Sequence, residues 1–235
     1  MGAVLAMTGH CDRPRRGVVR MAAALLMLGL LAGCAAGQGG GPLADALSRI
    51  GAARAPAGPS LRAQITPEAV AALNQPVILI ALPERGAEAL ARWVGANNGH
   101  ATWASGDGVS IRIRRGILSA TRGLGGDLLS ADIADVEAAL YAGGPTRVIR
   151  IHRYLDGTDQ VTIRALVCDI TRAGPDTAET AVGGFATTRF DESCSGPDRT
   201  FENRYWIGAN GQLRKTRQWV GPDVGTIVIE RLTGE

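Results

Sequence analysis

The chain has 235 residues, of which 46% are hydrophobic and 4% aromatic, and its formal net charge is +3. This composition suits a globular domain and excludes wholesale disorder. The segment before Cys34 carries four arginines against one aspartate, which accounts for the whole positive excess. The rest of the chain is therefore close to neutral, so its charge gives no reason to expect a nucleic-acid partner.

The N-terminus has the pattern of a secretory signal peptide that ends in a lipobox. Arginines precede an apolar run at 21–31, MAAALLMLGLL, which leads into Leu31-Ala32-Gly33-Cys34. The run is too short to span a bilayer, and small residues before the cysteine suit a peptidase that cleaves in front of a lipidated thiol. We predict that residues 1–33 are removed and that Cys34 carries the lipid anchor. An ordinary signal peptide with a chance cysteine is the alternative.

Removal of Cys11 with the signal and lipidation of Cys34 would leave two thiols, Cys168 and Cys194. An even remainder in an oxidising compartment predicts a disulfide between them. Two buried free thiols are the alternative, because the sequence does not give their separation. With no Cys-x-x-Cys pair and no clustered histidines, we expect neither a metal site nor a cofactor.

Three segments follow the signal peptide. Residues 34–41 comprise the lipidated cysteine and a glycine-rich tether, whose small side chains cannot build a core. Residues 42–75 contain short helices and a connector: one helix is predicted at 42–50, and Thr66-Pro67-Glu68 is typical of an N-cap opening a second. Residues 76–235 form a β-rich domain.

Short β-branched runs separated by turn residues indicate strands in this domain. They occupy 77–82, 101–104, 109–114, 117–121, 147–154, 160–171, 201–207, 213–220 and 226–232. Asp156-Gly157 and Asn210-Gly211 favour tight hairpins with positive φ angles, and the spacing at 132–141 predicts a helix stopped by Gly143-Gly144. Many antiparallel strands must bury one face and protect their edges. We therefore predict a mainly β periplasmic domain, an antiparallel barrel or a strongly curved sandwich, with a few short peripheral helices.

Two of the predicted strands alternate isoleucine with basic residues, as Ile111-Arg112-Ile113-Arg114 and Ile149-Arg150-Ile151-His152. Each should bury its isoleucines on one face and present its basic groups on the other. Because a guanidinium grips carboxylate and phosphate, these groups are candidate contacts for an acidic polysaccharide or a lipid headgroup. The candidates are Arg112, Arg114, Arg150, His152 and Arg164. A merely solvated face, or one paired with neighbouring acids, is the commoner outcome for such stripes.

Five aromatic residues could stack on sugar rings: Trp103, Tyr154, Tyr205, Trp206 and Trp219. Aromatic residues in strands are more often core, and we expect at least half of these to be so.

The chain shows no convincing catalytic motif. His152 and Asp156 lack a Gly-x-Ser-x-Gly elbow. The glycine-rich run at 123–127 lacks the Lys-Ser/Thr of a phosphate loop and is predicted to be a structural turn. Asp191 and Glu192 are adjacent in a strand and should point to opposite faces. We therefore predict no catalytic residues and no enzymatic activity.

Four strings occur in a suggestive order: TRGLG at 121–125 followed by Asp127-Leu128, Cys168 with Glu192-x-Cys194, Asn203-x-Tyr205-Trp206, and RQWVGP at 217–222. Together they resemble the YjbF/GfcB family of lipoproteins, named for group 4 capsule polysaccharide export. The resemblance covers about 77–232 plus the lipobox. It implies a β-barrel-like fold, no known catalysis, and a role in exopolysaccharide or capsule secretion beside an outer-membrane export channel and other periplasmic proteins.

Ala35, rather than an aspartate, follows Cys34, which favours the outer membrane as the destination. We expect a non-enzymatic lipoprotein anchored there, facing the periplasm, with polysaccharide export proteins and an acidic polysaccharide as partners. One alternative is a structural envelope lipoprotein that binds only proteins. Another is a polysaccharide-modifying enzyme, which would need converging carboxylates or a triad that the sequence does not show.

Overall fold

The computed structural model describes residues 60–143 and 146–233. The predicted signal peptide, the lipidated Cys34, the tether at 34–41 and the helix at 42–50 lie outside the described residues. No helix within the described ranges is long and apolar enough to cross a membrane.

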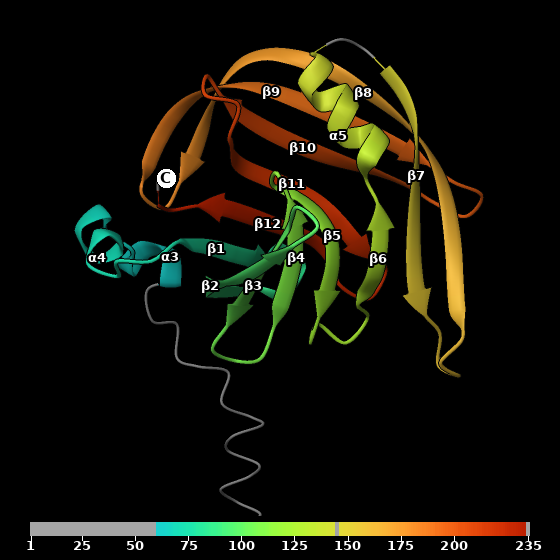
Figure 1. Cartoon of the computed structure of the whole chain (residues 1–235), viewed down its shortest axis with the longest axis horizontal. Helices are drawn as coiled ribbons and strands as arrows, with labels where there is room; N and C mark the ends of the chain where they lie inside the picture. The colour runs from blue at the N-terminus through green and yellow to red at the C-terminus, as the bar shows by residue number, and fades with distance from the viewer. Residues whose placement is uncertain (1–59, 144–145, 234–235) are drawn as a thin grey trace, which may run out of the picture. The chain divides into compact units, whose positions relative to one another are not determined.

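One antiparallel sheet of 12 strands makes up the described domain (Figure 1). Its strand order is β5-β4-β3-β2-β1-β12-β11-β10-β9-β8-β7-β6, and it curves until its terminal strands, β5 and β6, approach each other. The prediction of a mainly β, barrel-like fold is confirmed. The strands are β1 (Val77–Leu82), β2 (Ala87–Asn97), β3 (His100–Ser105), β4 (Ser110–Arg114), β5 (Ile117–Arg122), β6 (Leu128–Asp132), β7 (Thr146–Leu155), β8 (Val161–Thr180), β9 (Gly183–Ser195), β10 (Thr200–Gly208), β11 (Leu213–Gly221) and β12 (Gly225–Arg231).

Side chains, rather than a backbone ladder, join the two terminal strands of the sheet. The guanidinium of Arg122 in β5 donates to the carbonyls of Leu128 at 3.3 Å and Leu129 at 3.2 Å in β6. The hydroxyl of Thr121 donates to Asp127 at 2.8 Å and accepts from the Leu128 amide at 3.0 Å. The β5–β6 seam is therefore nearly closed by polar side chains.

The glycine-rich run at 123–127 is the turn at this seam, as predicted. The carboxylate of Asp127 accepts from the amides of Gly123 at 2.9 Å and Leu124 at 3.1 Å. Gly123 has a φ of +86°, and a Cβ there would lie 2.9 Å from the Gly108 carbonyl oxygen. The positive φ and the close approach of Gly108 therefore account for the glycine at this position.

The described helices are short. The predicted second helix is α4 (Pro67–Ala71), whose N-cap Thr66 accepts from the Ala69 amide at 3.2 Å. It follows α3 (Leu61–Gln64), and a 3-10 turn, η2 (Pro83–Arg85), follows β1. The predicted helix at 132–141 is α5 (Ala134–Ala142), ended by Gly143 at a φ of 77°.

The inner face of the sheet and α5 form the core. Val136 and Leu140 of α5 pack with Ile170, Phe190 and Tyr205, so α5 covers the end of the sheet that is uppermost in Figure 1. A second cluster, which includes Ile78, Trp103 and Ile227, fills the inside between β1, β3 and β12.

Cys168 of β8 and Cys194 of β9 are cross-strand register partners joined by a disulfide, with Cα atoms 4.0 Å apart. Both are fully buried. The predicted disulfide is confirmed, and the alternative of two free thiols is wrong.

Three strands, β2, β6 and β9, have no counterpart among the predicted runs, and β8 extends well beyond its predicted end. A register shift between Arg172 and Gly174 interrupts the β8–β9 ladder, and such bulges bend a strand. Both predicted hairpins are present. Gly211 has the expected positive φ of 77°, but in the turn at 156–160 the positive φ belongs to Asp159 rather than Gly157.

Candidate functional site

The predicted orientation of Ile149-Arg150-Ile151-His152 in β7 is wrong. Arg150 and His152 are 0% and 1% exposed, whereas Ile149 is 50% exposed. The basic residues can face inward because Glu192 of β9, also fully buried, compensates the guanidinium. The same prediction for β4 is confirmed, since Ile111 and Ile113 are buried and Arg112 is exposed.

Glu192 is the centre of a buried polar network. Its carboxylate accepts from Arg150 Nη1 at 3.0 and 3.2 Å, from Asn203 Nδ2 at 2.6 Å and from the Tyr205 hydroxyl at 2.6 Å. Burial raises the pKa of Tyr205 well above its ordinary value, and the negative charge of Glu192 adds to the effect. Burial alone would lower the pKa of Arg150, but the charge of Glu192 and the interactions with Tyr205 together outweigh it, and the pKa rises. The network therefore holds a fixed ion pair inside the sheet.

A chain of hydrogen bonds leads from this ion pair towards solvent. Arg150 Nε donates to Nε2 of His152 at 2.8 Å, so that nitrogen is an acceptor and the proton of the neutral ring is on Nδ1. Nδ1 then donates to the Tyr154 hydroxyl at 3.0 Å, which donates to the Val220 carbonyl at 2.7 Å. Burial and the charge of Arg150 lower the pKa of His152 well below its ordinary value. Burial raises the pKa of Tyr154 to about 12.

His152 and Tyr154 line a pocket of about 210 Å³, which we call the aromatic pocket. The rings of His152, Phe201 and Trp219 form a column, with neighbouring centroids 5.9 and 5.8 Å apart and planes within 18° of parallel. The rest of the lining comes from the β5–β6 turn, the β7–β8 hairpin, the β9–β10 turn and the β11–β12 turn. Those residues are Gly126, Asp127, Leu155, Asp156, Thr162, Arg164, Leu166, Arg199, Pro222 and Asp223.

The aromatic column depends on a local separation of β10 from β11. Their register pairs run from Ile207 with Leu213 only as far as Arg204 with Arg217. Next along β10, the side chain of Asn203 accepts from the Trp219 backbone amide at 2.7 Å. Asn203 thus joins the buried network to the strand that places Trp219 beside Phe201.

The charged rim of the pocket consists of ion pairs. Asp198 lies 3.5 Å from Arg164 and 3.1 Å from Arg199. Asp156 instead caps its own turn, accepting from the amides of Thr158 at 2.8 Å and Gln160 at 2.9 Å. Arg164 and Arg199 therefore offer donors at the pocket beside a neighbouring carboxylate.

The structure brings together two of the five predicted contact residues, His152 and Arg164, in the aromatic pocket. Arg150 reaches it only through His152. Arg112 and Arg114 belong to β4 and do not line it, and Arg114 forms an ion pair of 2.7 Å with Glu137 of α5.

Of the five predicted aromatic residues, Trp103 and Tyr205 are buried in the core, and Tyr154 packs against the core while lining the pocket. Trp206 and Trp219 are half-buried. The predictions missed Phe201 and Arg199 in the pocket and Glu192 and Asn203 beneath it. The alternation Glu192-x-Cys194 and Asn203-x-Tyr205 was the available signal, because residues two apart in a strand share a face.

Neither a metal site nor an acid/base pair is assembled at the network. Cys168, Glu192 and Cys194 have potential ligand atoms within 4.8 Å of one another, but both sulfurs are committed to the disulfide. Asp191 is half-buried while its neighbour Glu192 is fully buried, in agreement with the predicted opposite faces.

This architecture is similar to that of a solved protein structure. The hypothetical lipoprotein YmcC from Escherichia coli (K12) has a similar solved structure, with a TM-score of 0.64 and 20% sequence identity over 73% of this chain and 90% of that chain. At this identity the likeness shows a common fold. No curated protein matches the sequence significantly. The model of the family "Group 4 capsule polysaccharide lipoprotein gfcB, YjbF" matches residues 46–232, and the chain therefore belongs to this family of capsule polysaccharide lipoproteins.

Proposed function

We propose that the protein assists the secretion or assembly of an exopolysaccharide or capsule by holding a saccharide unit in the aromatic pocket. The observation that carries this proposal is the combination of stacked rings and a charged rim in one pocket. The apolar faces of sugar rings pack on aromatic side chains, while their hydroxyls pair with guanidinium and carboxylate groups. The family's connection with capsule polysaccharide supports the same ligand class.

The size of the pocket limits how much of a glycan it can hold. Clefts for drug-sized ligands measure roughly 300–1,000 Å³, whereas this pocket measures about 210 Å³. It suits about one ring. We infer that it contacts single units or an end of a polymer rather than enclosing a long segment.

The proposed location is the periplasmic face of the outer membrane, with a lipid on Cys34 as the anchor. The lipobox, Ala35 after the cysteine, and membership of a lipoprotein family support this location. The proposed protein partners are the outer-membrane export channel and the periplasmic export proteins beside it.

The proposed role is non-enzymatic. His152 is held between Arg150 and Tyr154 and is kept neutral by burial. Asp127 and Asp156, two carboxylates at the pocket, accept hydrogen bonds within their own turns. These assignments favour structural rather than acid/base roles. Release of reducing ends or other products from the bound glycan would contradict this part of the proposal.

The test is calorimetric titration of the detergent-extracted full protein with oligosaccharides prepared from the producing host's exopolysaccharide. We expect Trp219→Ala and Phe201→Ala to weaken binding about tenfold or more, since aromatic contacts of this kind contribute about 1 kcal/mol beyond area burial. Trp93→Ala is the matched control, because Trp93 is 49% exposed on β2 and does not line the pocket. Equal losses in the control, or no loss in the two pocket variants, would overturn the proposal.

A second candidate, a lipoprotein that binds only proteins, is favoured by one feature of the outer surface. Five aliphatic residues on the outer face of the β7–β8 hairpin are 41–57% exposed: Ile149, Leu155, Val161, Ile163 and Val167. Exposed apolar patches of this kind mark interaction surfaces. If Ile163→Glu abolishes polysaccharide secretion while glycan binding is absent in the wild-type protein, the second candidate is the correct one.

A further inference from the structure

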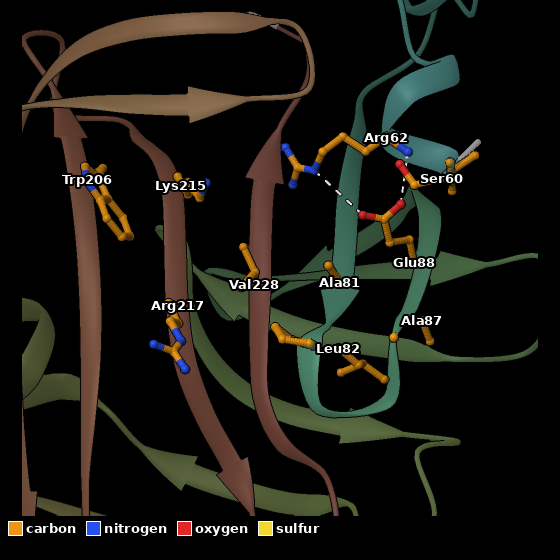
Figure 2. A pocket seen from close by; sticks show the side chains of 13 residues that line it. Ser60, Arg62, Ala81, Leu82, Ala87, Glu88, Trp206, Lys215, Arg217 and Val228 are labelled. Carbon is orange, nitrogen blue, oxygen red and sulfur yellow. Dashed lines mark hydrogen bonds and ion pairs between the residues drawn. The ribbon is translucent and has the colours of Figure 1, made fainter. Parts of the chain in front are cut away.

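A second cleft, of about 670 Å³, is lined by residues of five strands, β1, β2, β10, β11 and β12, and of α3 (Figure 2). Trp206 of β10 and Lys215 and Arg217 of β11 line one side, and Arg62 of α3 and Glu88 of β2 line the other. Val228, Ala81 and Leu82 form an apolar floor between them. We call this the basic cleft. It shares no lining residue with the aromatic pocket.

Two of its three basic residues are already neutralised by carboxylates. Glu230 is fully buried and lies 2.5 Å from Arg62 and 3.1 Å from Lys215, and it also accepts from the Ala181 amide at 3.0 Å. Glu88 lies 3.7 Å from the Arg62 guanidinium and accepts from the Arg62 backbone amide at 3.0 Å. Two carboxylates thus balance Arg62 and Lys215.

Arg217 is left without such a partner. Its side chain is exposed, and within the described ranges 60–143 and 146–233 this side chain forms no hydrogen bond or ion pair. The charge of Arg217 acts on the carboxylate of Glu84, but the two side chains do not form an ion pair. Burial alone would raise the pKa of Glu84, yet hydrogen bonds from its own backbone and from Thr226, with a smaller contribution from Arg217, lower it. The guanidinium fork of Arg217 therefore remains available to an anion at the cleft.

Trp206 provides a fixed ring beside this charge. Its indole N–H donates to Asp176 at 3.0 Å, and Arg189 holds the same carboxylate at 3.1 Å. The Lys215 ammonium lies 5.9 Å from the centre of the indole ring. Because its polar edge is tied down and the residue is half-buried, Trp206 presents an apolar surface of constant orientation to the cleft.

We propose that the basic cleft binds an acidic sugar unit, with its carboxylate on Arg217 and its ring against Trp206. A guanidinium pairs with a carboxylate through two parallel hydrogen bonds, and an aromatic face accepts the apolar face of a sugar ring. The inference rests on the proposed function in that the ligand is a saccharide. It adds that the ligand is anionic and that a separate site recognises the charge.

The experiment records the NMR signals of the tryptophan indole N–H groups in the 15N-labelled, detergent-extracted full protein. The protein is titrated with sodium galacturonate and, separately, with galactose. These probes differ in the carboxylate, and Trp206→Phe and Trp219→Phe assign the two signals. We expect galacturonate to shift the Trp206 signal. We expect galactose to bind this cleft at least about tenfold more weakly than galacturonate does. Arg217→Ala should weaken galacturonate binding about tenfold, whereas Arg112→Ala, which removes an exposed arginine on β4, should leave it unchanged.

Three results would overturn the acidic-sugar site: equal responses to both sugars, no effect of Arg217→Ala, or an equal shift of the Trp206 signal by inorganic phosphate, which would show a general anion site. The two signals also separate this inference from the proposed function. A response of Trp219 without Trp206 supports the aromatic pocket and overturns the basic cleft. A response of Trp206 without Trp219 supports the basic cleft and overturns the aromatic pocket as a saccharide site.

Discussion

The Nε of Arg150 donates a 2.8 Å hydrogen bond to Nε2 of His152, and both side chains are buried. A protonated imidazole would place a second N–H against the guanidinium and add a like charge beside it. The arrangement therefore requires a neutral His152 in the folded protein.

This requirement predicts a loss of stability in mild acid. The pKa of His152 is lowered in the folded state, first by burial and then by Arg150, whereas the unfolded chain keeps a value of about 6.5. Above that pH neither state binds the proton. Below it the unfolded state binds a proton that the folded state does not, so the free energy of unfolding falls by up to about 1.4 kcal/mol per pH unit.

Urea denaturation at about pH 7 and about pH 5.5 tests this expectation. The wild-type midpoint should fall in acid, and His152→Gln, which keeps an acceptor for Arg150, should fall much less. His100→Gln is the control, because burial also lowers the pKa of His100 but its side chain is less enclosed. If the denaturation midpoint of His100→Gln does not change with pH while that of His152→Gln still falls in acid, the acid-sensitive residue is His100 rather than His152.

The buried ion pair predicts a large effect of Glu192→Gln. The substitution leaves the Arg150 charge buried without a counter-charge, and breaking such a pair costs about 3–5 kcal/mol of unfolding free energy. Asp169→Asn, at the exposed Arg147–Asp169 pair, should leave stability nearly unchanged. Chemical denaturation measures the free energy of unfolding of both variants. If this free energy falls by a similar small amount in the two, the Arg150–Glu192 pair does not stabilise the fold.

The disulfide predicts sensitivity to reduction. Cys168 and Cys194 are 26 residues apart, and closing a loop of this size stabilises a fold by about 3 kcal/mol on the chain-entropy account. Dithiothreitol should therefore lower the denaturation midpoint of the wild-type protein. It should not alter that of Cys168→Ala/Cys194→Ala, whose midpoint should already match the reduced wild type. A response of the double variant to the reductant would point to another cause.

The seam predicts a local effect of Arg122→Ala. Hydrogen bonds from a charged group to carbonyls contribute about 1.5–3 kcal/mol, so we expect amide exchange in β6 to accelerate about tenfold or more. Arg92→Ala, an exposed arginine in β2, serves as the control. Unchanged exchange at residues 128–132 in Arg122→Ala would mean that packing alone keeps the seam together.

Strand positions followed from the sequence where β-branched residues alternate or cluster, as in β1, β4, β7 and β12. The missed strand β2, AEALARWVGAN, is rich in alanine, and its extended form comes from pairing with β1 and β3 rather than from its own propensity. β9, GGFATTRFDESCS, begins with two glycines and ends in charged and small residues, and it is held by its long pairing with β8 and by the disulfide. In both strands tertiary pairing determines the conformation.

The site was predictable only in part, because alternation within one strand does not say which face is inside. In β7 the apolar residues point out and Arg150 and His152 point in, and the reason lies in Glu192, 42 residues further along the chain. The pocket itself needs Phe201 and Trp219 beside each other, which depends on the separation of β10 from β11 at Asn203. The strings that resemble the family contain the buried residues Glu192, Cys194, Asn203 and Tyr205. They also contain Trp206 and Arg217 of the basic cleft and Trp219 of the aromatic pocket, so they mark both the buried network and the two proposed binding sites.

The connectivity of the sheet has a consequence for how the domain could be re-engineered. Each ladder joins strands that are consecutive in the chain, with one exception, the pairing of β1 with β12. A circular permutant that links residue 233 to residue 77 and begins within the turn at 123–127 would therefore be a plain up-and-down meander, with every backbone ladder retained. Its new termini would lie at the seam, where no ladder has to be broken, so β5 and β6 could be lengthened, tagged or displaced while the rest of the sheet keeps its pairing.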